Sequence, residues 1–224
     1  MTDGAFFQRI HDWFHPSQVV DGGVLWNPGD DVLPWIDVEL QYLWYKKIGE
    51  WLQPKTFLEV GVGYGYSTLS LLSGVTNVFD IGIVWVENES QWESGIAQAY
   101  VSINQSYRLD SGPVWVKSWE ELSLFKGKCF KGGQSYDLIH IDANHEYEHV
   151  TRDAFESFNY AQKGAHWLFH DSEDPPVAKA AEEFAEWNKL KWFKIPEVRC
   201  GLHVVHSCEE GECPILKGMA EMNG

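Results

Sequence analysis

Short apolar runs alternate along this chain with segments whose apolar positions recur at helical spacing. Residues 36–51 have the spacing of an amphipathic helix, and residues 56–61 form a mostly apolar run that is typical of a buried parallel strand. Further strands are predicted at 80–87, 113–117, 136–141, 165–170, 192–196 and 202–206. Further helices are predicted at 6–14, 66–72, 91–103, 120–125, 149–162 and 177–190. This alternation predicts an α/β, doubly wound, Rossmann-like fold with a mostly parallel seven-stranded sheet and helices on both faces.

The first 35 residues differ from the rest of the chain. They combine Trp, His, Pro and Gly residues, and their pattern predicts a short helix followed by a loop. We expect residues 1–35 to form an N-terminal lid or extension and residues 36–224 to form one domain. The sequence has no internal repeat, low-complexity tract or break in composition that would divide this domain, and its 224 residues are enough for one full hydrophobic core.

The charge of the chain narrows the class of its ligands. A formal net charge of −16 and the lack of a basic stripe argue against a nucleic-acid partner. No apolar run approaches the ~20 residues that span a bilayer, and the N-terminus lacks the residue order of a signal peptide. We therefore expect a cytoplasmic protein with a small-molecule substrate and no membrane contact. Its aromatic N-terminal segment leaves a homo-oligomer open.

The four cysteines do not form a recognisable disulfide pattern. Cys129, Cys200, Cys208 and Cys213 are too few and too irregularly spaced for a secreted disulfide scaffold. Cys208 and Cys213 enclose Glu-Glu-Gly-Glu, so that a disulfide or a metal-binding clip is an alternative there. We expect reduced thiols without a ligand.

A glycine-rich turn follows the first predicted strand and precedes a helix. Gly61, Gly63 and Gly65 alternate with other residues in this turn, and a helical pattern resumes at Ser67. Glycines permit a tight turn and the close approach of a ligand, and a helix N-terminus attracts anionic groups. The combination is typical of a nucleotide-type cofactor pocket, although a purely structural turn would use the same glycines.

Acidic residues end several predicted strands, at the sheet edge where open α/β folds bind ligands. Glu87 ends the second strand, where it would accept hydrogen bonds from a ribose diol; Asp80 is the alternative if that strand lies earlier in the sequence. Asp142 and Asp171 end two later strands, and His145 follows Asp142 by three residues. Two such carboxylates can converge on a divalent cation, and a nearby histidine can act as a general base.

Together these motifs resemble the class I S-adenosylmethionine-dependent methyltransferases, in particular the small-molecule O-methyltransferases of the catechol and macrocin types. The resemblance spans residues 35–206. It rests on Leu58-Glu59-Val60-Gly61-x-Gly63-x-Gly65-Tyr66-Ser67, on Ile141-Asp142-Ala143-Asn144-His145-Glu146-Tyr147-Glu148 and on Phe169-His170-Asp171. The order of the three motifs is more specific than any one of them.

The resemblance implies a binding site for S-adenosylmethionine. Glu59 would hold the amino end of the methionine part of this cofactor, and the backbone from Gly61 to Gly65 would pass beneath it. Tyr66 and Ser67 would border the methionine carboxylate. A carboxylate inside an apolar strand, such as that of Glu59, is costly unless it is paired.

The same resemblance implies that residues after other strands bind the ribose and the adenine ring of the cofactor. Glu87 would bind the ribose hydroxyls, and Ser118 and Trp119 would contact the adenine ring. Asp142, which we count among the catalytic residues, would contact both the cofactor and a metal ion.

The resemblance also implies the groups that carry out the reaction. His145 occupies the position at which the family has its catalytic Lys or His base, and Asp171 would be the second ligand of Mg²⁺ or another divalent cation. The chain departs from the metal-dependent pattern at Ser172, where those enzymes usually have Asp or Asn. Glu173, Asp174 or water would then have to provide the third ligand.

Three other histidines have simpler interpretations. We expect His140, in the middle of a strand, to be a packed and hydrogen-bonded core residue. We expect His149 to lie on an exposed helix face. His170 is either a core residue, a residue that supports the site, or a ligand.

The sequence thus leads to one hypothesis and two alternatives. The hypothesis is transfer of a methyl group from S-adenosylmethionine to a hydroxyl of a small molecule, such as a phenol, a catechol or a sugar, with metal assistance left open. One alternative is a non-catalytic S-adenosylmethionine-binding or scaffold protein, and the other is a nicotinamide-dependent Rossmann oxidoreductase. A fold alone does not distinguish these functions.

Overall fold

The structure is a computed structural model of the chain. It describes residues 35–63, 65–76, 80–84, 114–125, 135–195, 198, 200–209 and 211–222. Glu87, residues 1–34 of the predicted lid (residues 1–35) and the predicted helices at 6–14 and 91–103 lie outside these residues.

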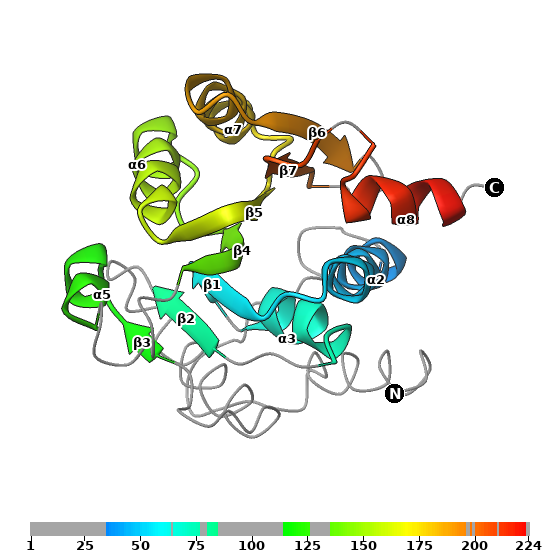
Figure 1. Cartoon of the computed structure of the whole chain (residues 1–224), viewed down its shortest axis with the longest axis horizontal. Helices are drawn as coiled ribbons and strands as arrows, with labels where there is room; N and C mark the ends of the chain where they lie inside the picture. The colour runs from blue at the N-terminus through cyan, green and yellow to red at the C-terminus, as the bar shows by residue number, and fades with distance from the viewer. Residues whose placement is uncertain are drawn as a thin grey trace.

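The described strands form one sheet in the order β3-β2-β1-β4-β5-β7-β6 (Figure 1). The strands are β1 (Thr56–Val60), β2 (Asp80–Val84), β3 (Val114–Val116), β4 (Tyr136–Ile141), β5 (Ala161–His170), β6 (Lys191–Ile195) and β7 (Leu202–His206). Neighbouring strands from β3 to β5 are parallel, whereas β7 is antiparallel to both β5 and β6. The predicted α/β Rossmann-like fold is confirmed, and β7 makes its sheet mixed.

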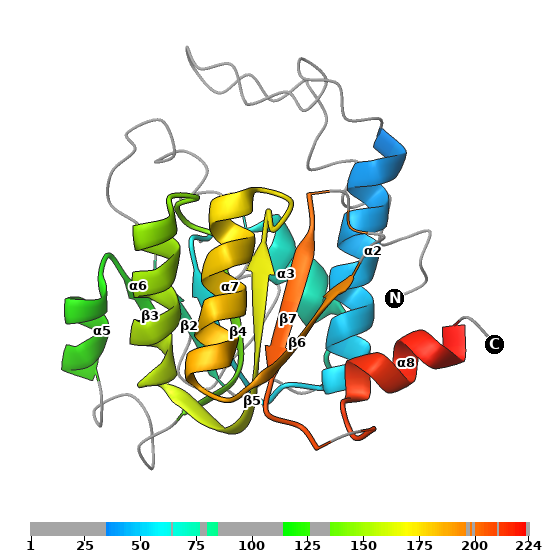
Figure 2. The same ribbon diagram turned by 90° about the horizontal axis from the view of Figure 1, so that it is seen from above.

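Helices cover both faces of the sheet. The helices are α2 (Trp35–Leu52), α3 (Tyr66–Ser73), α5 (Trp119–Phe125), α6 (Tyr147–Phe158), α7 (Pro175–Trp187) and α8 (Pro214–Met222). Helices α5, α6 and α7 lie on one face, and α2, α3 and α8 lie on the other (Figure 1). The view turned by 90° looks onto α6 and α7, which lie side by side in front of the sheet (Figure 2). None of the described helices is both long enough and apolar enough to cross a membrane.

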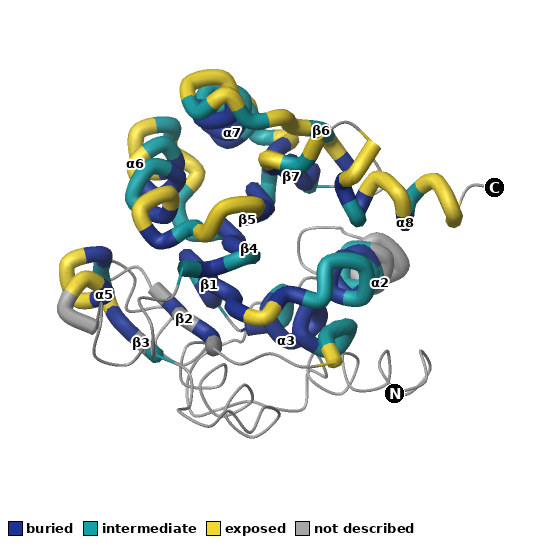
Figure 3. The backbone as a smooth tube through the Cα atoms, in the orientation of Figure 1, coloured by how far each residue is buried: buried dark blue, intermediate teal, exposed yellow. Residues whose placement is uncertain are grey.

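The sheet separates two apolar cores. One core includes Ile139, Trp167 and Phe184 on the α6–α7 side, and the other includes Phe57 and Leu168 on the α2–α3 side. Every residue of β1 is buried, and the tube drawing shows burial concentrated along the central strands (Figure 3). Burial on both faces explains why the central strands are continuous apolar runs rather than alternating ones.

The order of the strands locates the expected ligand site. The chain leaves β1 toward β2 and β3 on one side, and it later places β4 and β5 on the other side of β1. In open α/β sheets such a reversal opens a crevice beyond the carboxyl ends of the two central strands. The glycine-rich turn after β1 and the Asp142 segment after β4 therefore meet at this edge.

One predicted helix needs correction, and one helix of the structure was missed. The helix predicted at 149–162 is instead α6, which begins at Tyr147 and ends at Phe158. Ala161 already belongs to β5 and pairs with Tyr136 of β4, so sheet pairing overrides the helical spacing at this point. Helix α8 was not predicted at all, although a proline at its first position is a common sign of a helix start. Its Gly218 packs so closely on Trp51 that a β-carbon there would lie 2.2 Å from the indole ring.

Candidate active site

The turn after β1 is built on glycine backbone conformations. Gly61, Gly63 and Gly65 have φ angles of 86°, 48° and 78°, which side chains disfavour. A β-carbon on Gly61 would lie 2.3 Å from the carbonyl oxygen of Asp142, so the turn packs directly on the chain that leaves β4. Within the described part of the chain, a β-carbon on Gly63 would have no atom within 4 Å apart from its chain neighbours. The turn is therefore tightly packed at Gly61 and open at Gly63.

The first turn of α3 is hydrogen-bonded to a buried carboxylate near the end of β1. Glu59 is completely buried, and its carboxylate accepts hydrogen bonds from Thr68 Oγ1 at 2.7 Å and from Ser67 Oγ at 3.3 Å. It also lies 2.9 Å from Nδ1 of His140 in the neighbouring strand β4. The buried carboxylate is therefore paired, as a charge inside an apolar strand must be. Its predicted contact with the amino group of the cofactor stays a prediction.

His140 is a buried, hydrogen-bonded histidine, as predicted. Its Nε2 atom lies 2.8 Å from the hydroxyl of Tyr45 in α2. Burial raises the pKa of Tyr45 well above its ordinary value, so this hydroxyl stays protonated and donates to Nε2. Nδ1 of His140 is then the protonated nitrogen that donates to Glu59, and α2 is linked to β1 through β4.

Four titratable side chains meet at the ends of β4 and β5. Nδ1 of His170 lies 3.0 Å from Oδ1 of Asp142 and 2.9 Å from Oδ2 of Asp171, so one N–H group bridges two carboxylates. Nε2 of His145 lies 3.0 Å from the same Oδ2 atom of Asp171. The structure thus brings the predicted Asp142, His145 and Asp171 together and places His170 between the two acids.

The charges in this cluster depend on one another. Burial disfavours the charged form of His170, but the adjacent Asp142 and the hydrogen bonds to both acids outweigh it and hold the pKa of His170 well above its ordinary value. Burial likewise disfavours ionisation of Asp171, yet hydrogen bonds from His145 and His170 lower its pKa. The hydrogen bond to Asp171 also raises the pKa of His145. The two carboxylates thus favour a proton on Nδ1 of His170, against the effect of burial.

The backbone at Asp171 is unusual. Asp171 has a φ angle of 54°, in the left-handed region that non-glycine residues rarely adopt, and its carbonyl accepts a hydrogen bond from the amide of Asp174. This turn ends β5 and aims the carboxylate back toward His145 and His170. Uncommon conformations of this kind cluster at functional sites.

Sequence spacing did not predict the residues on the far side of His170. Its Nε2 atom lies 2.7 Å from the side-chain nitrogen of Gln41 in α2 and 3.2 Å from Sγ of Cys200. Gln41 is 129 residues away from His170 in the sequence. Only the packing of α2 against the sheet brings them together, so no local motif could have indicated the contact.

Ser118 and Trp119 have other partners in the structure. Ser118 Oγ accepts a hydrogen bond from the amide of Glu121 and caps α5. Trp119 is buried, donates from Nε1 to Asp153 at 2.9 Å, and stacks on Tyr160. Their contact with an adenine ring stays a prediction.

Three side chains at this edge offer possible ligands for a divalent cation. One ligand atom each from Asp142, His145 and Asp171 lies within 4.8 Å of the others, and two carboxylates with an imidazole suit several divalent ions. Ser172 is completely buried, and its Oγ lies beside Gly201, so it does not provide the missing ligand. The three residues fit a cation whose remaining coordination positions are filled by water. Binding of this cation would replace the hydrogen bond between His145 and Asp171.

Comparison with known proteins places the chain in a family. A family model described as "Methyltransferase domain" matches residues 58–172, which include the glycine turn, Asp142, His145 and Asp171. The chain therefore belongs to this methyltransferase family. A search of curated proteins found no match to the chain.

Solved structures share the fold of this chain at low sequence identity. An O-methyltransferase from Bacillus cereus in complex with SAH is 14% identical over 91% of this chain and 97% of its own, with a TM-score of 0.53. TomG from Streptomyces achromogenes, an O-methyltransferase of tomaymycin synthesis in complex with SAM, is 13% identical over 93% and 100%, with a TM-score of 0.57. SAH-bound PaMTH1 from Podospora anserina is 16% identical over 93% and 98%, with a TM-score of 0.54. At these identities the likeness establishes the fold.

Proposed function

We propose that this protein transfers a methyl group from S-adenosylmethionine to a hydroxyl group of a small molecule such as a phenol, a catechol or a sugar. The observation that carries the proposal is the position of His145 and Asp171 beside Asp142 and the glycine turn, at the carboxyl edge of the sheet. Membership of the methyltransferase family supports the reaction class. Structural neighbours that are O-methyltransferases crystallised with SAM or SAH support the cofactor and the acceptor atom.

The cofactor is proposed to lie over the open backbone at Gly63. No described residue fills the space beside a β-carbon at Gly63, and this space and the N-terminus of α3 suit the amino-acid end of S-adenosylmethionine. Tyr66 and Ser67 begin α3 and would border the methionine carboxylate. The carboxylate of Glu59 would bind the amino group of the cofactor. Glu87, Ser118 and Trp119 are proposed for the ribose and adenine.

His145 is proposed as the general base. Its Nε2 atom is bonded to Asp171, which leaves Nδ1 as the nitrogen that can take a proton, and about half of the side chain is exposed. As the acceptor oxygen attacks the sulfonium methyl group, the carbon–oxygen bond forms, the carbon–sulfur bond breaks, and the hydroxyl proton moves to His145. The products are the methyl ether and S-adenosylhomocysteine. Asp171 orients the ring and stabilises the imidazolium that forms.

The same methyl transfer could instead use a divalent cation. The convergence of three ligand atoms at the carboxyl edge of the sheet favours this second mechanism. Asp142, His145 and Asp171 would hold the cation. When bound, a divalent cation lowers the pKa of a coordinated hydroxyl group. Because a histidine that ligates a cation cannot also accept a proton, His145 has one of the two roles. Loss of turnover in EDTA with recovery on addition of Mg²⁺ supports the metal form, and full turnover in EDTA supports the base alone.

The acceptor pocket is proposed to involve residues 1–35 as a lid, with residues 36–224 as the catalytic domain. The aromatic side chains of the lid would suit a flat acceptor or a sugar. The same proposal includes a homo-oligomer in which copies of the chain contact one another through residues 1–35.

Calorimetry and a turnover assay test the proposed function together. S-adenosylhomocysteine should bind to the full-length protein and NAD should not; the reverse result would establish a nicotinamide-dependent enzyme. A panel of phenols, catechols and sugars is then assayed for transfer of a labelled methyl group. Binding of S-adenosylhomocysteine without turnover on any acceptor would favour a scaffold protein over an enzyme.

A further inference from the structure

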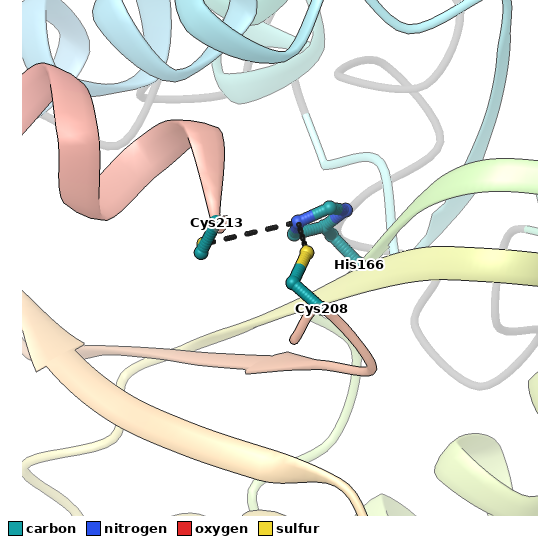
Figure 4. Close-up of side chains that lie close together, drawn as sticks. All are labelled: His166, Cys208 and Cys213. Atoms are coloured by element: carbon teal, nitrogen blue, oxygen red, sulfur yellow. Dashed lines mark hydrogen bonds between the residues drawn. The ribbon is translucent and has the colours of Figure 1, made fainter. Parts of the chain in front are cut away.

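A second cluster of possible ligands lies away from the candidate active site, on the α2–α8 side of the sheet. It consists of His166 in β5, Cys208 just after β7, and Cys213 just before α8 (Figure 4). His166 is five residues before Asp171, which separates the two sites by about 16 Å along an extended strand. Neither the sheet-edge acids nor the glycine turn belongs to this cluster.

We infer that His166, Cys208 and Cys213 form a zinc-binding site that fastens the C-terminal helix to the sheet. Nε2 of His166 lies 3.3 Å from Sγ of Cys208 and 3.9 Å from Sγ of Cys213. Typical zinc–sulfur and zinc–nitrogen bond lengths at a tetrahedral angle give a nitrogen–sulfur separation of about 3.6 Å. All three ligand atoms lie within 4.8 Å of one another, so small side-chain movements would bring them to coordination distance.

The surroundings suit a cation with soft ligands. His166 and Cys213 are buried and Cys208 is half-buried, which shields the site from water. Four residues separate the cysteines, a spacing found in zinc-binding loops. Gly211 turns this loop with a φ angle of 76°, and the sequence between the cysteines is Glu-Glu-Gly-Glu, whose negative charge attracts cations.

The protonation states agree with the geometry. Burial and the neighbouring His206 lower the pKa of His166 to about 4, so its imidazole is neutral at physiological pH and can bind a metal. Burial and the nearby Cys213 raise the pKa of the Cys208 thiol, which is therefore protonated without a metal. Metal coordination deprotonates thiols and would release these protons.

A second contact holds the cysteine loop in place. The amide of Cys208 donates to Nδ1 of His206, whose ring stacks on that of His166. Because this hydrogen bond occupies Nδ1 of His206, that residue supports Cys208 rather than serving as a fourth ligand. Three protein ligands leave the fourth tetrahedral position to water.

The site would have a structural effect on the candidate active site. Cys213 directly precedes α8, and α8 packs through Gly218 against Trp51 of α2. The same helix α2 carries Gln41, which contacts His170. A zinc ion at the cysteine loop would thus stabilise the docking of α8 and, through it, the position of α2. This inference does not depend on the proposed methyl transfer.

Zinc binding to the full-length protein tests the inference. Protein kept reduced with a phosphine is equilibrated with Zn²⁺ against a chromophoric chelator, and one tightly bound zinc ion per chain is expected. Cys208→Ser, Cys213→Ser and His166→Gln should each weaken binding at least about tenfold. Cys200→Ser and Asp171→Asn, which alter the other possible ligand clusters, should leave this binding unchanged. Retention of the zinc ion by a Cys208→Ser, Cys213→Ser double variant would overturn the inference.

Two measurements on the unmodified protein do not depend on the folding of variants. Zn²⁺ should protect Cys208 and Cys213, but not Cys200, from alkylation detected by peptide mass spectrometry. Co²⁺ should produce the absorption of thiolate-to-cobalt charge transfer, which carboxylate ligands do not give. Equal alkylation with and without Zn²⁺, or an intact mass that shows a disulfide in freshly isolated protein without zinc, would contradict the site.

Discussion

Nε2 of His145 lies 3.0 Å from Oδ2 of Asp171, although the two residues follow different strands of the sheet. The same carboxylate oxygen lies 2.9 Å from Nδ1 of His170, so Asp171 joins an exposed histidine to a buried one. This arrangement fixes which nitrogen of His145 faces the solvent. The hydrogen bond to Asp171 orients the candidate base and is the main cause of its raised pKa.

His145→Ala should lower kcat by about 10²–10⁴-fold, the usual contribution of a positioned general base. The affinity for S-adenosylhomocysteine should stay the same, because the proposed cofactor contacts come from β1 and α3. Turnover and calorimetry on the same protein measure the two effects. His149→Ala is the matched control, since His149 is an exposed helix residue beside Glu146 and should have no effect. Equal losses of turnover and cofactor affinity would show that His145 is not the general base.

Asp171→Asn should shift the pH dependence of kcat/KM. A base acts in its neutral form, so the rate of the unmodified enzyme should rise with pH through the pKa of His145, which Asp171 raises above the ordinary value of about 6.5. Without the carboxylate this pKa falls, and the rise in rate should move to lower pH with a lower plateau. A His145→Gln variant should lack the rise altogether. An unchanged midpoint in Asp171→Asn would mean that Asp171 does not tune the base.

His170→Gln should destabilise the protein by about 2 kcal/mol, less than for a fully buried pair because the two carboxylates are about a quarter exposed. The raised pKa of His170 means that its contribution is complete below the unfolded value of about 6.5 and is lost as the pH rises through the folded value. The lowered pKa of Asp171 means that its contribution is present above about 3.9 and is lost as the pH falls through the folded value.

The difference in unfolding free energy between the two proteins should therefore be largest between about pH 4 and 6.5 and should shrink in more alkaline buffer. Urea denaturation across this range measures it. His149→Gln should change stability by less than about 0.5 kcal/mol, as expected for an exposed site. A difference that is constant with pH would show that the charge of His170 is not what stabilises the cluster.

The two glycines that begin the turn should respond differently to alanine. Both have positive φ angles, which cost about 1–2 kcal/mol for a residue with a β-carbon. Gly61→Ala adds a backbone collision with Asp142 and should lower stability much further, whereas the β-carbon of Gly63→Ala meets no atom of the residues that the structure describes, and this variant should fold. If the cofactor occupies the space above Gly63, Gly63→Ala should bind S-adenosylhomocysteine at least about tenfold more weakly. Unchanged affinity would place the cofactor elsewhere.

The sequence by itself indicated most of the described elements, with α8 as an exception, and the edge of the sheet to which the strand-end acids belong. Apolar runs such as β1 and β4 show burial directly, and Asp142 and Asp171 end their strands, so the parallel arrangement brings them to one edge. The end of α6 and the start of β5 could not be predicted from the sequence, because the pairing of Ala161 with Tyr136 decides where the helix ends. Glu87 and residues 1–34 lie outside the described part of the chain.

Only the tertiary structure decided which polar groups neutralise one another. His170 was one of several histidines in the sequence, and its place between two carboxylates depends on distances that local spacing does not encode. Gln41 reaches the same ring across 129 residues, and His166 meets Cys208 and Cys213 across more than 40. The physical reason is that periodicity reports which face of an element is buried, whereas hydrogen bonds and possible metal ligands depend on how separate elements pack together.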